Sequence, residues 1–328
     1  MLIKRRARWE ISENLATPEA AFFDRRTLIK GASAFALALP LSACDSKLAA
    51  AQKAGPDGPD PNAKLYPAKR NPAFKLDRAL TEQKVSTTYN NYYEFGTSKD
   101  IWQDAQALPI RPWDISIEGM VEKPFKISAD ALIARMPLEE RLYRHRCVEA
   151  WSMAVPWTGF PLKALVDLAK PLSGARFVMM QTFMKPEVAP GQNEGWYPWP
   201  YTEGLTMAEA ANDLAFLVTG VYGKPLPKQM GAPLRLACPW KYGFKSVKAI
   251  VRFRFQAERP KTYWETVGPS EYGFWANVNP AVAHPRWSQA SERVIGTNQV
   301  VPTQLFNGYA AEVAALYKDI HIGDALYR

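Results

Sequence analysis

The stretch YRHRCVEAWSMAVP, residues 143–156, decides how the rest of this chain is interpreted. Arg144 and Arg146 precede its single cysteine, Cys147, and an apolar run follows it. Positive charge lowers the pKa of a thiol, and the thiolate is the form that binds metals or acts as a nucleophile. The alternative is a free buried cysteine beside surface arginines. Because one cysteine does not complete a zinc or iron–sulfur site, a metal here requires a cofactor that brings further donor atoms.

The N-terminal segment has the pattern of a targeting sequence. Arg25 and Arg26 precede the apolar run GASAFALALPL, and residues 1–43 resemble a twin-arginine export signal. The run is shorter than the ~20 apolar residues of a membrane span. Twin-arginine export carries folded, cofactor-loaded proteins, so we expect a periplasmic protein. LSAC, ending at Cys44, also matches a lipobox, and lipid attachment at Cys44 remains an open alternative.

Composition indicates a linker followed by one folded domain. Residues 44–70 are rich in Ala, Pro, Gly, Lys and Asp without apolar periodicity, which is typical of a linker. Residues 71–328 are therefore predicted to form a single domain. The chain is 47% hydrophobic and has a formal net charge of +9. Many of the basic residues lie in the export signal. The remaining positive charge is modest and is explained by a solvated basic surface, so no nucleic-acid partner is expected.

Short strands separated by turns predict a β-rich α+β domain with mixed sheets. Ser128 is expected to begin a short helix before Pro137, and Thr206 with Glu209 forms a predicted capping box. The 27 prolines and 19 glycines divide the remainder into turns and ordered loops. The predicted strands are residues 113–118, 176–183, 214–219, 234–238 and 249–255.

The cysteines exclude several redox arrangements. Without Cys44, only Cys147 and Cys238 remain, and a bridge between them stays open, although Cys238 on an apolar strand favours a place in the core. The sequence contains no CxxCH haem site, no CxxC pair and no iron–sulfur spacing. Electrons would therefore come from another protein or from a separately bound cofactor.

Several long blocks, in order, resemble one known family. They are YNNYYEFG (89–96), PLEERLYRHRCVEAWSMAVPWTGFPL (137–162), LRLACPWKYGFKSVK (234–248), EYGFWANVNP (271–280), HPRWSQASERVIG (284–296) and LFNGYA (305–310). They are similar to the catalytic subunit of the periplasmic protein-methionine-sulfoxide reductases, which have the sulfite oxidase-like molybdopterin-binding fold. The resemblance covers most of the chain from about Thr88 onward.

The resemblance implies a cofactor site. Molybdenum would be held by one pterin and by Cys147, which would be both the metal ligand and the catalytic residue. Arg235 and Lys248 suit a phosphate, and hydroxyl, amide and backbone groups suit a pterin edge. Read without the resemblance, these charges would be exposed strand residues. The implied cofactor contacts are Asn90, Tyr93, Glu94, Cys147, Thr182, Arg235, Ser246, Val247 and Lys248.

The resemblance also implies a reaction and its partners. Methionine sulfoxide in oxidised periplasmic proteins would be reduced to methionine, with electrons from a membrane-bound haem b cytochrome subunit. A protein-borne substrate requires an accessible site, for which GWYPWPY (195–201) is a predicted rim or, alternatively, simple packing. Beyond the complex with the cytochrome, a monomer is expected, because too little chain remains for the dimerisation domain of true sulfite oxidases.

Two departures bear on these expectations. Where the family usually has an amide before the GAP of residues 231–233, this chain has Met230, whose thioether donates no hydrogen bond. Either the backbone replaces that contact or it is missing. True sulfite oxidases typically have CAGNR at the ligand cysteine, whereas VEAW follows Cys147 here, which argues against sulfite as the substrate.

Alternative functions remain at this stage. Within the same class, the protein could be a sulfite oxidase-like enzyme or a reductase of small S- or N-oxides. A cysteine hydrolase could use Cys147 with His284 as its base, since His145 is too close along the chain to be a natural partner. A periplasmic ligand-binding protein could use the many Trp and Tyr side chains as stacking surfaces.

Overall fold

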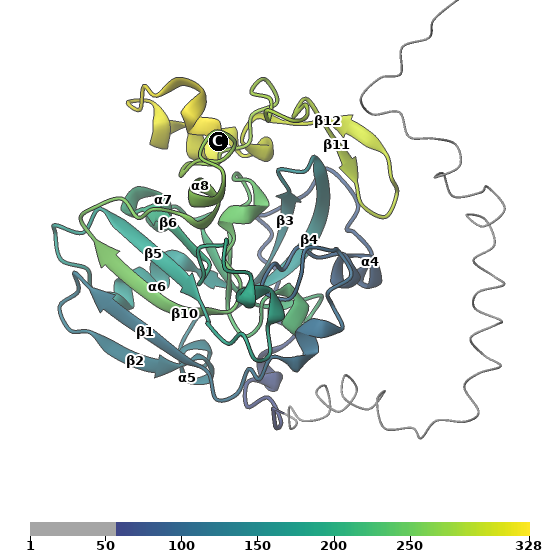
Figure 1. The fold of residues 1–328 in the computed structure, drawn as a ribbon. Helices are drawn as coiled ribbons and strands as arrows, with labels where there is room; N and C mark the ends of the chain where they lie inside the picture. Colours follow the sequence, from purple (N-terminus) through teal and green to yellow (C-terminus); the bar gives the residue numbers. More distant parts are fainter. Residues whose placement is uncertain (1–56) are drawn as a thin grey trace, which may run out of the picture. The chain divides into compact units, whose positions relative to one another are not determined.

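The computed structural model describes residues 57–328, in which two β-sheets form the frame and short helices pack around them (Figure 1). This is the predicted class of mixed sheets with short helices. The export signal, the lipobox and the first part of the linker lie outside the described residues. Within the described part, none of the helices combines the length and the apolar character that a membrane crossing needs.

The first sheet has the strand order β2-β1-β10-β5-β6. β1 and β10 run parallel, and the other neighbours are antiparallel. Phe253 and Phe255 are buried while Arg254 is exposed, so β10 alternates between a covered and a wet face. A bulge after Ile250 shifts the register, and Ile250 is buried too. The strands are β1 (Asp114–Gly119), β2 (Phe125–Ser128), β5 (Phe177–Thr182), β6 (Thr202–Thr206) and β10 (Ile250–Gln256).

The second sheet is built on the long strand β4. β4 pairs with β3 on one side, and with β11 and β7 on the other, while β12, β8 and β9 extend the sheet. Residues 151–160 are all buried, so both faces of β4 are covered. The strands are β3 (Glu139–Arg146), β4 (Trp151–Pro161), β7 (Phe216–Val221), β8 (Lys224–Pro225), β9 (Arg235–Ala237), β11 (Ser291–Val294) and β12 (Val300–Pro302).

Side-chain caps fix the starts of the predicted helices. The Ser128 hydroxyl accepts a hydrogen bond from the backbone of Ala131, and Thr206 and Glu209 form the predicted capping box. Both predicted helices are thereby confirmed. The α-helices are α4 (Gln83–Thr88), α5 (Ala129–Ile133), α6 (Leu162–Ala169), α7 (Met207–Ala211), α8 (Tyr263–Val267) and α9 (Ala310–Val313).

Residues 57–70 contact the domain, although the sequence assigned them to the linker. The Asn62 amide donates to the carbonyl of Asp130, the Tyr66 hydroxyl bonds Thr219, and Arg70 forms an ion pair with Glu140. These contacts are polar and join residues far apart in the sequence. They therefore leave no apolar periodicity in residues 57–70 from which they could be predicted. The folded domain therefore begins before residue 71.

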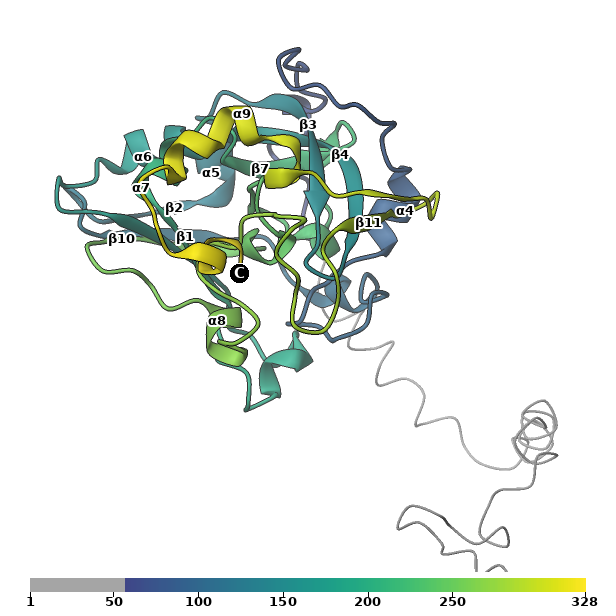
Figure 2. The same ribbon diagram turned by 90° about the horizontal axis from the view of Figure 1, so that it is seen from above.

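The C-terminal segment connects the two sheets. Figure 2 shows α9 between α7 and β3. The Tyr309 hydroxyl accepts a hydrogen bond from the backbone of Arg144 in β3, and the Asn212 amide, at the end of α7, donates to the carbonyl of Glu312. The segment thereby supports β3, the strand that leads into Cys147.

Candidate active site

A cavity of about 980 Å³ lies at the end of β3 and beside the first half of β4. It is lined mainly by residues 86–94, 145–157, 243–248 and 264–272. Segments far apart in the sequence thus meet in one place. Eight predicted cofactor contacts line this cavity: Asn90, Tyr93, Glu94, Cys147, Arg235, Ser246, Val247 and Lys248.

Cys147 lies in the tight turn between β3 and β4. Its carbonyl accepts a hydrogen bond from the backbone of Ala150, and its own N–H donates to the carbonyl of Trp151. The thiol faces the cavity, 3.6 Å from Nδ2 of Asn91 and 3.7 Å from Oε2 of Glu149. Cys147 and Cys238 are both free thiols, so the Cys147–Cys238 bridge left open by the sequence is not formed.

The neighbouring arginines do not activate the thiol, and this prediction was wrong. Burial, and then the negative charge of Glu149, raise the pKa of Cys147 to about 12. Side chains alternate along a strand, so Arg144 and Arg146 point away from the side that carries His145. A metal at the sulfur would reverse this balance, because a coordinated thiol is deprotonated outright.

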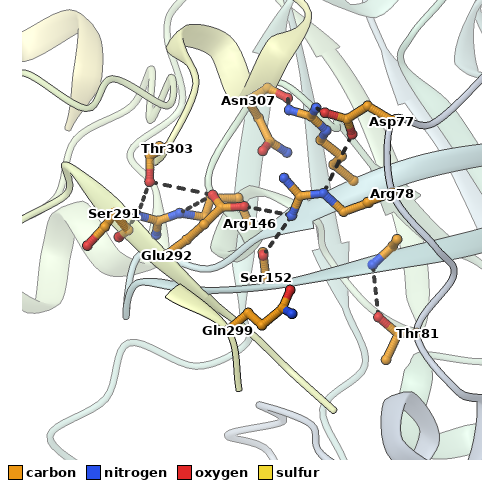
Figure 3. A network of polar contacts seen from close by, with 12 residues as sticks. Asp77, Arg78, Thr81, Arg146, Ser152, Ser291, Glu292, Gln299, Thr303 and Asn307 are labelled. Carbon is orange, nitrogen blue, oxygen red and sulfur yellow. Dashed lines mark hydrogen bonds and ion pairs between the residues drawn. The ribbon is translucent and has the colours of Figure 1, made fainter. Parts of the chain in front are cut away.

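Arg146 instead belongs to a network of polar contacts with Glu292 and Thr303 (Figure 3). Its guanidinium donates to the carbonyl of Cys147 and lies 3.0 Å from Glu292, whose other oxygen is 2.9 Å from Arg78. Gln289 and Thr303 accept further hydrogen bonds from Arg146. Both charged side chains of the Arg146–Glu292 pair are at most 2% exposed. The pair therefore holds the backbone of Cys147 in a fixed place.

Arg235 is a buried cation without a carboxylate partner among residues 57–328. Its side chain donates to the carbonyls of Met230, Leu236 and Ser246, and its guanidinium lies over the Trp157 ring. It is 4% exposed, and burial lowers its pKa to about 10. Carbonyl dipoles orient the guanidinium but do not neutralise it. The cavity wall is thus prepared for an anion.

Lys248 and Glu94 form a second charged feature of the wall. The Lys248 ammonium donates to the carbonyl of Asn91 at 2.6 Å. Burial and the nearby Arg235 lower the pKa of Lys248, while burial raises that of Glu94. The charged form of each side chain is therefore disfavoured unless an opposite charge lies nearby.

Of the remaining predicted cofactor contacts, Asn90 and Tyr93 line the cavity and Thr182 does not. Asn90 donates to the carbonyl of Ser86, but its own buried carbonyl oxygen has no partner in the described part of the chain. The Tyr93 ring packs edge-on against Trp264. Thr182 does not line the cavity; it is buried, and its hydroxyl donates to the carbonyl of Ala249.

Met230 and Cys238 behave differently from one another. The Met230 side chain lines the cavity, and its carbonyl accepts the hydrogen bond from Arg235. The sequence left open whether the backbone replaces the missing amide or the contact is absent. The Met230 backbone does take part, by orienting the Arg235 cation, while the Met230 thioether adds no hydrogen-bond donor. Cys238 is buried and lies outside the cavity lining, as expected for a core residue.

Sequence reasoning missed several cavity residues. Glu149 accepts hydrogen bonds from Asn91 and Trp151 and pairs with Lys99 at 2.8 Å; although burial raises its pKa, these partners outweigh burial and keep it lowered. His145, dismissed as a catalytic base, also lines the cavity. Burial and the nearby cations lower its pKa to about 3. Residues 145 and 147 are two positions apart along an extended segment, where side chains at that spacing lie on the same face. This spacing was the sequence signal that could have identified His145 as a cavity residue.

His284 does not serve Cys147. Its imidazole stacks on Trp287 with ring centroids 3.9 Å apart, and its Nε2 lies 3.5 Å from Glu271. Neither contact reaches the thiol, whose hydrogen-bond partners are Asn91 and Glu149. A nucleophilic cysteine needs its base within hydrogen-bond reach, so the geometry disfavours the cysteine-hydrolase alternative.

Aromatic side chains from the predicted rim reach the cavity. Trp196, Tyr197 and Tyr201 are among its lining residues. Trp196 is 65% exposed and stacks on Tyr197 with ring centroids 3.5 Å apart. A large indole held in solvent beside a cavity provides an apolar contact for a ligand that extends outward.

The comparisons agree with this geometry. The family model for the oxidoreductase molybdopterin binding domain matches residues 103–264. Among solved structures, the sulfane dehydrogenase SoxCD from Paracoccus pantotrophus is similar, with 18% identity and a TM-score of 0.40 over 46% of this chain and 40% of that chain. The aligned part is thus less than half of either protein. The match of residues 103–264 to a molybdopterin binding domain agrees with the predicted fold class of mixed sheets with short helices.

The cavity residues fit such a cofactor. Cys147 offers a soft ligand, Arg235 an uncompensated cation and Asn90 an orphaned acceptor. No group of three or more His, Cys, Asp or Glu side chains in residues 57–328 could hold a metal by itself. The other donor atoms for a metal at Cys147 would therefore come from the cofactor.

Proposed function

We propose that this chain is a molybdopterin-dependent oxidoreductase that reduces methionine sulfoxide in oxidised periplasmic proteins to methionine, a proposal supported by the match of residues 103–264 to the oxidoreductase molybdopterin binding domain. When bound, the molybdenum cofactor supplies two-electron oxygen-atom transfer, so that the sulfoxide, two electrons and two protons give the thioether and water. Cys147 and the cavity residues Arg235 and Lys248 would hold that group through its metal and its phosphate.

The observation that carries this proposal is the environment of the Cys147 sulfur. Its partners are the Asn91 amide and the Glu149 carboxylate, and Glu149 keeps its negative charge because its pKa is lowered. Lys99 pairs with this carboxylate at 2.8 Å, so the charges beside the sulfur compensate one another and a substrate there needs no charge of its own. The neutral substrate is therefore favoured.

The other cavity residues can perform the binding steps. The Asn91 amide donates to Glu149 and to the Cys147 sulfur; if the sulfur were bound to a metal, the N–H directed at it would become available to orient a sulfoxide oxygen. Lys99, paired with Glu149, fixes the carboxylate. Trp196 at the mouth offers an apolar surface to the polypeptide that carries the oxidised methionine. A binding site of this kind suits a substrate too large to enter completely.

Partners and location complete the proposal. We propose a membrane-bound haem b cytochrome as the electron donor, since the sequence contains no second redox motif. The protein would work as a monomer apart from that complex. It would reach the periplasm folded through the twin-arginine route, with lipid attachment at Cys44 as an alternative to a free N-terminus.

The test compares two substrates and two cysteines. Purified, metal-loaded protein with an artificial low-potential donor is expected to reduce methionine sulfoxide in an oxidised protein and to leave sulfite unchanged. Cys147→Ser is expected to lose turnover while Cys238→Ala, changed in the core, keeps it. Sulfite oxidation without sulfoxide reduction, or full activity in Cys147→Ser, would overturn the proposal.

A further inference from the structure

His145 presents its imidazole to the cavity without a partner in the described chain. It lies in β3, two residues before Cys147, and is half-buried. No hydrogen bond or ion pair within residues 57–328 involves either ring nitrogen, although neighbouring polar side chains such as Asn91 and Glu149 are bonded. Both ring nitrogens are therefore available to a group that enters the cavity.

Packing holds this imidazole in place. A Cβ atom added to Gly243 would lie 2.8 Å from both Cε1 and Nε2 of His145, so the glycine provides the space that the ring occupies. The Trp151 ring packs nearby at a centroid distance of 5.8 Å. The ring is therefore positioned by apolar contacts, while its nitrogens stay available.

The imidazole is unsuited to act on Cys147 itself. Among the described residues no hydrogen bond joins the His145 imidazole to the Cys147 sulfur. The thiol in fact bonds Asn91 and Glu149. The group that would meet the imidazole is whatever fills the cavity beside the sulfur.

The polar groups that act on His145 across the cavity are the cations of Arg235 and Lys248, while the wall beside it on β4 is apolar. The cross-strand neighbour of His145 in β4 is Met153, and Met153, Val155 and Met230 all line the cavity with apolar side chains. A pterin edge carries several donors and acceptors that need partners when buried. Arg235 and Lys248 can only donate, whereas a neutral His145 imidazole can also accept a hydrogen bond from a pterin N–H.

We propose that the His145 imidazole hydrogen-bonds the pterin of the bound cofactor and thereby positions it against Cys147. This inference rests on the cofactor assigned under the proposed function, but it is independent of the substrate. His145 is in this role a positioning residue, and it supplies the polar contact that the side chain of Met230 cannot make.

The experiment measures cofactor content rather than activity alone. Protein is purified from cells grown with limiting molybdate, and pterin and molybdenum are determined per chain, with thermal melting as a folding check. His145→Phe keeps a ring but removes both nitrogens, and we expect pterin occupancy to fall between about 3- and 10-fold. His145→Gln restores a donor and is expected to stay within about 2-fold of the wild type. His321→Phe, at an exposed position, is the control.

A second pair of variants tests the geometry without removing a nitrogen. Gly243→Ala pushes a methyl group against the imidazole and is expected to lower pterin occupancy. In a His145→Ala background the same change should have no further effect. This cycle remains informative if His145→Phe folds poorly.

The outcomes separate the two proposals. Full pterin content in His145→Phe, or no recovery in His145→Gln, overturns the role of His145. Wild-type protein that contains pterin but does not reduce methionine sulfoxide contradicts the proposed substrate and leaves the His145 result valid. Wild-type protein that contains no pterin overturns both.

Discussion

Arg146 and Arg235 are both buried arginines close in space to the candidate cofactor site, yet their partners differ. Arg146 is matched by Glu292, Gln289 and Thr303, so its charge is compensated inside the protein. Within residues 57–328, Arg235 bonds only backbone carbonyls and keeps an uncompensated charge at the cavity wall. The first arrangement stabilises a fold and the second prepares a binding site. The partner, more than burial, distinguishes the two roles.

Removing the compensation at Arg146 should have the largest effect. Glu292→Gln leaves Arg146 and Arg78 without their carboxylate, and we expect the free energy of unfolding to fall by about 3–5 kcal/mol. Denaturant unfolding of the cofactor-free protein measures it. Glu122→Gln, in the exposed pair with Lys170, is the matched control and should change stability by less than about 1 kcal/mol. Equal losses would contradict the comparison.

Arg235→Met should separate binding from folding. We expect the unfolding free energy of the cofactor-free protein to change by less than about 1 kcal/mol, because lost hydrogen bonds are offset by removal of a buried charge. Pterin binding should weaken by about 10- to 100-fold, measured as pterin per chain under limiting supply. Arg252→Met, on the partly exposed Arg252 of β10, should keep its pterin. A large loss of stability in Arg235→Met would assign it the structural role.

Lys248→Met should have a smaller effect of the same kind. The ammonium is half-buried and already donates to the carbonyl of Asn91, so it contributes less to anion binding than Arg235. We expect pterin binding to weaken by about 10-fold, with Lys224→Met on exposed β8 as the control. If Lys248→Met lost more pterin than Arg235→Met, the order of the two cations would be reversed.

The pair of Arg144 with Asp77 should give the smallest effect. Burial raises the pKa of Asp77, but the hydrogen bond and charge of Arg144 together outweigh it, so the pKa is lowered. Stability from this pair is present above pH ~3.8 and is lost as the pH falls through the folded-state pKa. Asp77 is 52% exposed, so solvent screening limits the contribution to about 0.5 kcal/mol or less. Acid unfolding of Asp77→Asn should therefore differ little from wild type, and a large difference would contradict this ranking.

Local signals predicted part of the fold. Strands with one wet face, such as β10, and capped helices, such as α5 and α7, were visible because periodicity and capping are short-range. β4 was not, since both its faces are buried and its residues do not alternate. β11 was hidden because its stabilising residue, Glu292, is polar and pairs with side chains far away in the sequence.

The candidate site depended on long-range contacts in the same way. From the residues themselves only Cys147 stood out, and the other contacts came from resemblance to a family. The predicted effect of Arg144 and Arg146 failed because neighbours in a strand point to opposite faces. His145 and Glu149 could have been recognised by applying that same period around Cys147.

The central claim is that the Cys147 sulfur binds a pterin-held molybdenum. X-ray absorption at the molybdenum edge of metal-loaded wild-type and Cys147→Ser protein tests it directly. The account predicts that the serine variant retains the metal with one sulfur neighbour fewer and one oxygen neighbour more. An identical sulfur shell in both proteins would contradict it.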